Sequence, residues 1–184
     1  DGNERKRQRE LNTKVKSIDI RPEHIDQRAE IGHWEGDTIV GKERTTRILT
    51  HVERKTGYLV ADLLPEVSSA IVREKTIESF RNIPKEMRTS FTYDNGAEFA
   101  DWELTERQLE NQIFFAHPYH SWERGTNENT NGLIRRYFPK RTLFANIKEV
   151  ELKNIVKQIN LRPRKRLEYQ SPYEVFHGVK LRTL

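Results

Sequence analysis

Three acidic residues occupy three short polar motifs of this 184-residue chain. Asp37 lies in HWEGDTIVGK, Asp94 in FTYDNGAEF and Glu128 in PYHSWERGTNENTNGL, with 33 residues between the second acid and the third. Carboxylates suit Mg²⁺, and a few are enough because water and substrate phosphate oxygens complete its shell. Two such ions roughly 3.5–4 Å apart can activate an oxygen nucleophile and stabilise a leaving oxygen. The three acids therefore predict a two-Mg²⁺ site for phosphodiester chemistry, with Mn²⁺ as a substitute.

The surrounding pattern predicts an α/β fold. A first strand from Trp34 to Val40 is followed by a turn near Gly41 and a second strand, and GYLVADLL supplies a third. The later motifs, in order, are a helix (SSAIVREKTIESFRNI), a strand (TSFTYD), a helix (AEFADWELTERQLEN), a strand (QIFFA) and two helices (NENTNGLIRRYF and IKEVELKNIVKQINL). The order βββαβαβαα is that of an RNase H-like fold, a five-stranded mixed sheet flanked by helices.

This outline gives each acid a defined position. Strand alternation places Asp37 on one face with His33, Glu35 and Ile39. Asp94 ends the fourth strand, at the edge where ligands gather in open α/β sheets. Glu128 is expected near the start of the third helix, after the loop HPYHSWERG, which is expected to move to admit DNA.

Each acid also has a structural explanation when it is considered alone. Asp94 is typical of an Asp-Asn-Gly turn, and Glu128 of a first helical turn, where the helix dipole favours a carboxylate. Glu98 is expected to open the second helix for the same reason, while Glu35 is the nearest alternative metal ligand. No single structural reason requires acids at all three positions, whereas a metal site does.

Composition is typical of a soluble protein with a large solvated surface. Hydrophobic residues make up 34% of the chain and charged residues 33%, and no apolar run is long enough for a membrane span or a signal peptide. The chain has no cysteine, which excludes disulfides and thiol catalysis. His117 and His120 are three residues apart but lack a third soft ligand, so zinc is not predicted there.

Positive charge is concentrated at the two ends of the chain. Residues 1–16 carry six Lys and Arg against three acids and residues 135–184 carry 13 against four, whereas residues 17–134 carry 14 against 21. Basic flanks neutralise DNA phosphates and release their counterions, although charge runs can also be solvated surface. The expected DNA-binding residues are Trp122, Arg124, Asn127, Asn131, Arg135, Arg136, Lys140, Arg141, Arg164, Lys165 and Arg166.

Some of these residues have a second interpretation. Asn127 and Asn131 either contact substrate phosphates, orient the Glu128 carboxylate or cap the helix. Trp122 either stacks on a frayed terminal base, since aromatic faces hold unstacked bases, or anchors its loop.

The chain divides into two expected regions. Residues 1–30 have few large apolar side chains and no sustained period, which predicts a basic arm or linker, partly helical after Pro22 or disordered. Residues 31–184 are expected to form the catalytic core with basic C-terminal helices.

The motifs HWEGDTIVG, TYDNGAEFA, PYHSWERGTNENTNGLIRRYFPK and RPRKRLEYQSPYEVF resemble the catalytic core of bacterial insertion-sequence transposases of the IS-thirty family, which are related to retroviral integrases. The resemblance covers roughly residues 31–178. It implies Asp37, Asp94 and Glu128 as the catalytic triad of a DDE transposase. Family members usually carry helix-turn-helix modules before the core, so this chain is expected to be a fragment.

The resemblance also implies an activity and its partners. Water activated at the metal site would cut at the transposon end, and the resulting 3′-hydroxyl would attack target DNA. The expected partners are transposon-end DNA, target DNA and further copies of the chain, at least a dimer, in the bacterial cytoplasm near the nucleoid. A non-catalytic DNA-binding or assembly module of the same fold is the alternative.

Overall fold

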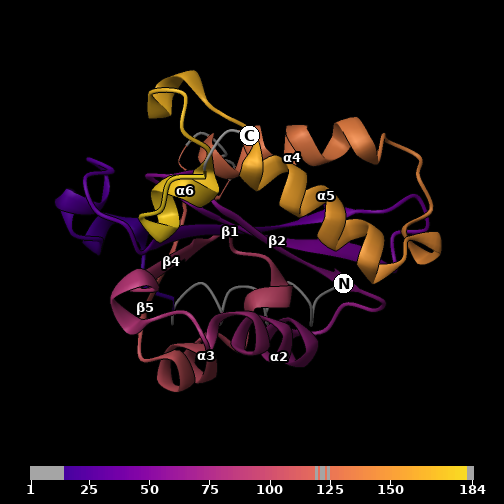
Figure 1. Ribbon diagram of the computed structural model, residues 1–184. Helices are drawn as coiled ribbons and strands as arrows, with labels where there is room; N and C mark the ends of the chain where they lie inside the picture. Colours follow the sequence, from indigo (N-terminus) through magenta and orange to yellow (C-terminus); the bar gives the residue numbers. More distant parts are fainter. Residues whose placement is uncertain (1–14, 119, 121–122, 124, 182–184) are drawn as a thin grey trace.

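The computed structural model describes residues 15–118, 120, 123 and 125–181 (Figure 1). Within these residues one five-stranded mixed sheet has the spatial order β3-β2-β1-β4-β5. Its strands are β1 (His33–Val40), β2 (Arg47–Glu53), β3 (Leu59–Leu64), β4 (Ser90–Tyr93) and β5 (Gln112–Phe115). The first three strands are antiparallel, whereas β4 pairs parallel to β1 and β5 parallel to β4. The predicted RNase H-like order is confirmed.

Helices cover both faces of the sheet (Figure 1). One side carries α2 (Ser69–Phe80) and α3 (Trp102–Leu109), and the other carries α4 (Gly125–Tyr137) and α5 (Glu149–Leu161). A short final helix, α6, spans Pro172–His177. The described single-turn 3-10 helices are η1 (Ile18–Ile20), η2 (Glu23–Ile25), η3 (Lys85–Met87), η4 (Ala97–Phe99), η6 (Phe144–Asn146) and η7 (Lys165–Leu167). No described helix is both long and apolar enough to span a membrane.

Strand alternation gives the sheet two apolar cores. Towards α2 and α3, the fully buried rings of Trp34, Phe80 and Phe91 pack together in edge-to-face contacts. Towards α4 and α5, Ile39 packs among the buried residues Ile48, Leu59, Ala61, Ile134, Phe138, Phe144, Ile147, Leu152, Ile155 and Ile159. Trp34 and Ile39 are an odd number of residues apart on β1, so their side chains point to opposite faces of the sheet, which confirms the expected alternation. Asp37 lies on the same face as Ile39 and therefore faces α4.

Gly36 has a packing role beside Asp37. The ring of Tyr93 lies so close to the Gly36 backbone that a β-carbon there would overlap it. The Tyr93 hydroxyl lies 2.9 Å from Nε2 of His51, the residue paired with Gly36 on β2. This aromatic packing fills the α2 side of β1 next to Asp37.

The helix expected over AEFADWELTERQLEN is interrupted. Residues Ala97–Phe99 form the single turn η4, and α3 begins only at Trp102. Asp101 precedes α3 with a non-helical backbone and makes a 2.5 Å ion pair with Arg73 of α2. The expectation that Glu98 opens this helix is therefore wrong, because Glu98 turns towards the sheet.

The described part of the arm lies against the sheet. Ser17 forms a parallel bridge with Phe115 of β5, and η2 follows Pro22 directly. Ile25 and Arg21 are buried, and Nη1 of Arg21 donates a 3.0 Å hydrogen bond to the hydroxyl of Thr92. Residues from 15 onward thus add side chains to the core.

A buried histidine makes the stability of this fold depend on pH. Burial lowers the pKa of His51 to about 3, so between about 6.5 and 3 the unfolded chain binds the proton and the folded chain does not. The free energy of unfolding should therefore fall with decreasing pH below about 6.5, by at most about 1.4 kcal/mol per pH unit from this group.

Urea unfolding at pH 7.5 and pH 5.5 measures this effect. His51→Gln removes the titration and retains a side chain that can hydrogen-bond to Tyr93, so its unfolding free energy should depend less on pH. Burial also lowers the pKa of His33 and His177, which makes comparison with the parent chain necessary. Equal pH dependence of the unfolding free energy in the two proteins would show that His51 is not the group responsible.

Candidate functional site

Asp37 is held in the middle of the central strand β1. Its half-buried carboxylate accepts a 2.8 Å hydrogen bond from the backbone N–H of Thr38 at Oδ1. Its other oxygen, Oδ2, accepts a 3.0 Å bond from the side-chain amide of Asn131 on α4. Asn131 therefore orients the Asp37 carboxylate.

Asp94 occupies the corresponding position on the neighbouring strand. Glu35 of β1 pairs with Thr92 of β4 in parallel register, so two residues further on Asp37 and Asp94 lie on adjacent chains and face the same side. Asp94 Oδ1 accepts a 3.0 Å bond from the Gly96 N–H, which forms the expected turn. Parallel pairing of β1 with β4 thus brings the carboxylates of Asp37 and Asp94 together where β4 ends.

Glu128 is the fourth residue of α4, and its side chain is exposed. The helix lies on the same side of the sheet as Asp37 and Asp94 and touches Asp37 through Asn131. The three carboxylates do not form a cluster within 4.8 Å; among the described residues only His24, Glu30 and His33 meet that distance. Carboxylates repel one another without a cation, and two ions need not share all three ligands.

Glu35, the alternative ligand, holds the start of α4. Its carboxylate is fully buried, and Oε2 accepts a 2.8 Å hydrogen bond from the backbone N–H of Asn127. Oε1 lies 3.6 Å from Nε of Arg54, a buried guanidinium. A carboxylate satisfies one of the free N–H groups at a helix start and is favoured there by the helix dipole.

Thr50 of β2 joins the two asparagines to the sheet. Its hydroxyl oxygen lies 3.1 Å from Oδ1 of Asn127 and 3.0 Å from Oδ1 of Asn131. One hydroxyl carries one proton, so it donates to one amide oxygen at a time. Asn127 is fully buried, and a DNA contact by its side chain would require it to leave this contact.

Glu98, just beyond the Asp94 turn, contacts strands β1 and β2. Its Oε1 accepts a 2.9 Å hydrogen bond from the hydroxyl of Thr38 and makes a 2.6 Å ion pair with Arg47. Thr38 follows Asp37 directly, and Glu98 lies four residues beyond Asp94. Glu98 is therefore a bridge between β1, β2 and the Asp94 turn.

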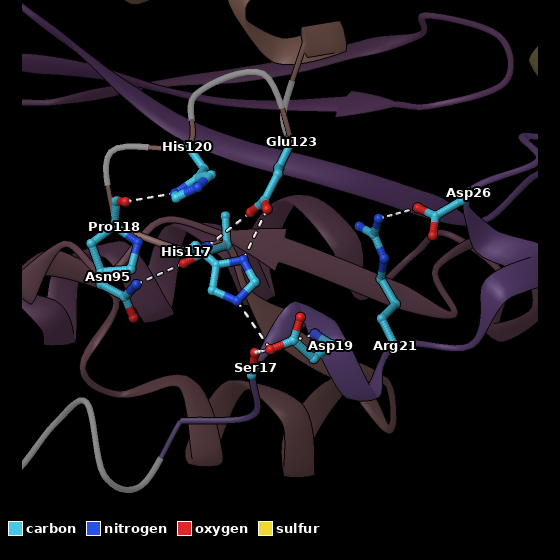
Figure 2. A network of polar contacts seen from close by, with 10 residues as sticks. Ser17, Asp19, Arg21, Asp26, Asn95, His117, Pro118, His120 and Glu123 are labelled. Atoms are coloured by element: carbon cyan, nitrogen blue, oxygen red, sulfur yellow. Dashed lines mark hydrogen bonds and ion pairs between the residues drawn. The ribbon is translucent and has the colours of Figure 1, made fainter.

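His117 and Glu123, described residues before α4, are linked to the arm through Asp19 (Figure 2). His117 Nδ1 lies 2.9 Å from Oε1 of Glu123, and Nε2 lies 3.0 Å from Oδ2 of Asp19. The contacts with Glu123 and Asp19 raise the pKa of His117, so this link weakens only as pH rises through the raised value. Asn95 also donates a 2.7 Å bond to the Ala116 carbonyl, which joins the Asp94 turn to the end of β5.

The expected DNA-binding cations are distributed over two surfaces. Arg135 donates to the Val40 carbonyl at 2.8 Å and lies over the Phe144 ring, whereas Arg136, Lys140 and Arg141 are exposed. Arg164 and Arg166 donate to backbone carbonyls of Ile159 and Lys55. Trp122 and Arg124 lie outside the described residues.

A basic cavity of about 440 Å³ opens beside the first turns of α4. It is lined by Gly125, Thr126, Asn129, Thr130 and Leu133 together with Arg28, Gly57, Arg164, Lys165, Arg166 and Pro172. Arg28 was not expected from the sequence, because no motif distinguishes it from the other arm cations. The same is true of Thr50 and Arg54, whose roles depend on contacts across the fold.

Known proteins resemble this chain in sequence and in fold. Transposase InsI for insertion sequence element IS30A of Escherichia coli K12 is 40% identical over 171 residues, covering 89% of this chain and 43% of that protein. The transposase for insertion sequence element IS4351 of Bacteroides fragilis is 42% identical over 162 residues, covering 88% and 49%. The chain belongs to the IS30 family of transposases. It spans about half the length of these relatives, and no protein-family model matches it.

Solved structures support the fold of this IS30-family chain. The catalytic core domain of BIV integrase aligns with a TM-score of 0.61 at 19% identity, over 79% of this chain and 93% of that one. A chain of the simian T-cell lymphotropic virus intasome aligns with a TM-score of 0.67 at 19% identity, over 84% and 57%. At 19% identity, these alignments show the fold of the chain.

Removing Glu35 should destabilise the fold of this IS30-family chain. Glu35→Ala leaves the Arg54 guanidinium without its buried anionic partner and the Asn127 N–H without its acceptor, and breaking a buried pair in this way costs about 3–5 kcal/mol. Chemical denaturation measures the loss, and hydrogen exchange at Asn127 should become faster. Glu103→Ala, at an exposed site on α3, should change stability by less than about 0.5 kcal/mol. Equal stability of the two variants would show that Glu35 does not hold α4.

Proposed function

We propose that this chain is the catalytic core of a DDE transposase that cuts transposon-end DNA and joins its 3′-hydroxyl to target DNA. The observation that carries the proposal is the parallel pairing of β1 with β4, which sets Asp37 and Asp94 side by side facing α4. Homology to IS30-type transposases supports DNA as the substrate.

In this proposal Asp37, Asp94 and Glu128 hold two Mg²⁺ ions, with Mn²⁺ as a substitute. The donor set fits, because all three residues offer carboxylate oxygens, and the Asn131 amide fixes the orientation of Asp37. Bound metal would supply an activated oxygen nucleophile and stabilise the leaving oxygen. Glu128 is exposed on α4, so its carboxylate is accessible from solvent to a metal ion and a DNA phosphate.

The residues around the triad have separate tasks. Glu35 and Thr50 fix α4 and its asparagines against the sheet. The cations Arg136, Lys140 and Arg141 at and beyond the end of α4 hold DNA phosphates, and at least two copies of the chain assemble on the two DNA ends. Trp122 and Arg124 engage the transposon end in this scheme.

The activity is tested with labelled, pre-cut transposon ends, a plasmid target and Mg²⁺ or Mn²⁺, and the products are resolved on denaturing gels. Joined products are expected from the parent chain, whereas Asp94→Asn and Glu128→Gln should lose them while remaining folded. Relief of carboxylate repulsion should leave the thermal stability of Asp94→Asn equal or slightly higher.

Glu103→Gln is the matched control, because it removes an exposed carboxylate on the opposite side of the sheet. It should retain joining. Strand transfer by Asp94→Asn would remove this residue from the triad, and DNA binding without any joining by the parent chain would favour the non-catalytic module.

A second test concerns the exposed cations at and beyond the end of α4. Replacing Arg136, Lys140 and Arg141 with Ala should weaken binding to unrelated DNA sequences and reduce the salt dependence by up to about 0.9 units of slope per lost phosphate contact. Fluorescence anisotropy at several salt concentrations measures this slope. Replacement of Arg81 and Lys85, exposed on the α2 side, is the control. Equal slopes in both variants would mean that the α4 cations are solvated surface.

A further inference from the structure

A second group of metal-ligating side chains lies where the arm meets the start of β1. His24 in η2, Glu30 in the following turn and His33, the first residue of β1, each offer a ligand atom, and these atoms lie within 4.8 Å of one another. No step of the proposed DNA chemistry uses these residues. The group contains two imidazoles and one carboxylate, so it differs in kind from the all-carboxylate site.

His33 is the fixed member of this group. It is only 3% exposed, and its Nδ1 lies 2.7 Å from the hydroxyl oxygen of Ser90, which is fully buried on β4. In the tautomer in which Nδ1 donates to Ser90, Nε2 presents its lone pair to Glu30, whose Oε2 lies 3.8 Å away. A ligating histidine characteristically donates its other N–H to such a partner, which fixes the ring and its tautomer.

The other two members can adjust to an ion. His24 and Glu30 are exposed, and the rings of His24 and His33 meet edge to face with centroids 5.8 Å apart. Zinc–ligand bonds of about 2.0–2.2 Å require the ligand atoms to come closer together than 4.8 Å, and the exposed side chains of His24 and Glu30 are the ones free to move.

The charged side chains of Arg54 and Asp26, near this group, have ion-pair partners of their own. The buried Arg54 guanidinium is directed to other acids, with Nε 3.6 Å from Glu35 and Nη2 3.7 Å from Asp26. Asp26 is also paired with Arg21. These pairs leave the Glu30 carboxylate as the anionic partner of the two imidazoles.

We propose that His24, Glu30 and His33 form a Zn²⁺ site whose fourth position is open to water. Two imidazoles and a carboxylate suit Zn²⁺, whereas Mg²⁺ prefers an all-oxygen shell. Ligands from η2, the turn and β1 would make the ion a cross-link between the arm and the central strand. A ligand that binds the folded chain alone stabilises it by mass action.

The test uses the chain without a histidine tag, treated with chelator, dialysed and then titrated with Zn²⁺ in excess Mg²⁺. Calorimetry should show one Zn²⁺ per chain, and Zn²⁺ should raise the melting temperature. His24→Ala and Glu30→Gln should each weaken Zn²⁺ binding at least about tenfold, the scale seen when even indirect metal partners are lost. Both sites are exposed, so the variants should fold, which circular dichroism checks.

His120→Ala and His177→Ala are the controls, because both histidines lie outside the group. They should bind Zn²⁺ like the parent chain. Absence of Zn²⁺ binding, unchanged affinity in His24→Ala and Glu30→Gln, or loss of binding in either control would each overturn the proposal. None of these measurements depends on DNA cleavage, so the result is independent of the transposase activity.

Discussion

The buried carboxylate of Glu35 is the constraint on which the candidate site depends. A charge without solvent is costly unless it is paired and hydrogen-bonded, so the chain must supply partners for it. One partner is the Asn127 N–H at the start of α4 and the other is Arg54. The start of α4 is thereby fixed against β1, and Asn131, about one turn further along, reaches Asp37.

The central strand serves several functions because its side chains alternate. Trp34 and Gly36 face the aromatic core, where the Tyr93 ring packs against the glycine backbone. Glu35 and Asp37 face α4, and the parallel neighbour β4 places Asp94 at the corresponding position. The proposed carboxylate ligands thus lie on one side of the strand pair's pairing region, while the imidazole of His33 lies at the start of β1, where the arm approaches.

The sequence predicted the features that depend on local pattern. The alternation of β1, the turn at Asp94 and the helix carrying Glu128 follow from periodicity and turn residues, and the order of the predicted elements, βββαβαβαα, indicated an RNase H-like sheet. It did not predict features that depend on contacts distant in sequence. Glu98 has the appearance of a helix-opening acid, yet Thr38 and Arg47 draw it towards the sheet.

The same limit applies to the buried polar residues. Arg21 resembles any other arm cation in sequence, but it lies buried against Thr92 of β4. Glu35 was a candidate ligand because it shares a face with Asp37, and its helix-anchoring role appears only once α4 is in place. Contacts between residues far apart in the sequence leave no periodic pattern along the chain from which they could be predicted.

Anomalous diffraction from crystals of the chain soaked in Mn²⁺ tests the central claim most directly. We expect Mn²⁺ beside β1 where β4 ends, bound by Asp37 and Asp94 with Glu128 as the third protein ligand. Crystals of Asp94→Asn should show no such anomalous peak. If the Asp37 and Asp94 carboxylates carry no metal in crystals saturated with Mn²⁺, the proposed metal site is wrong.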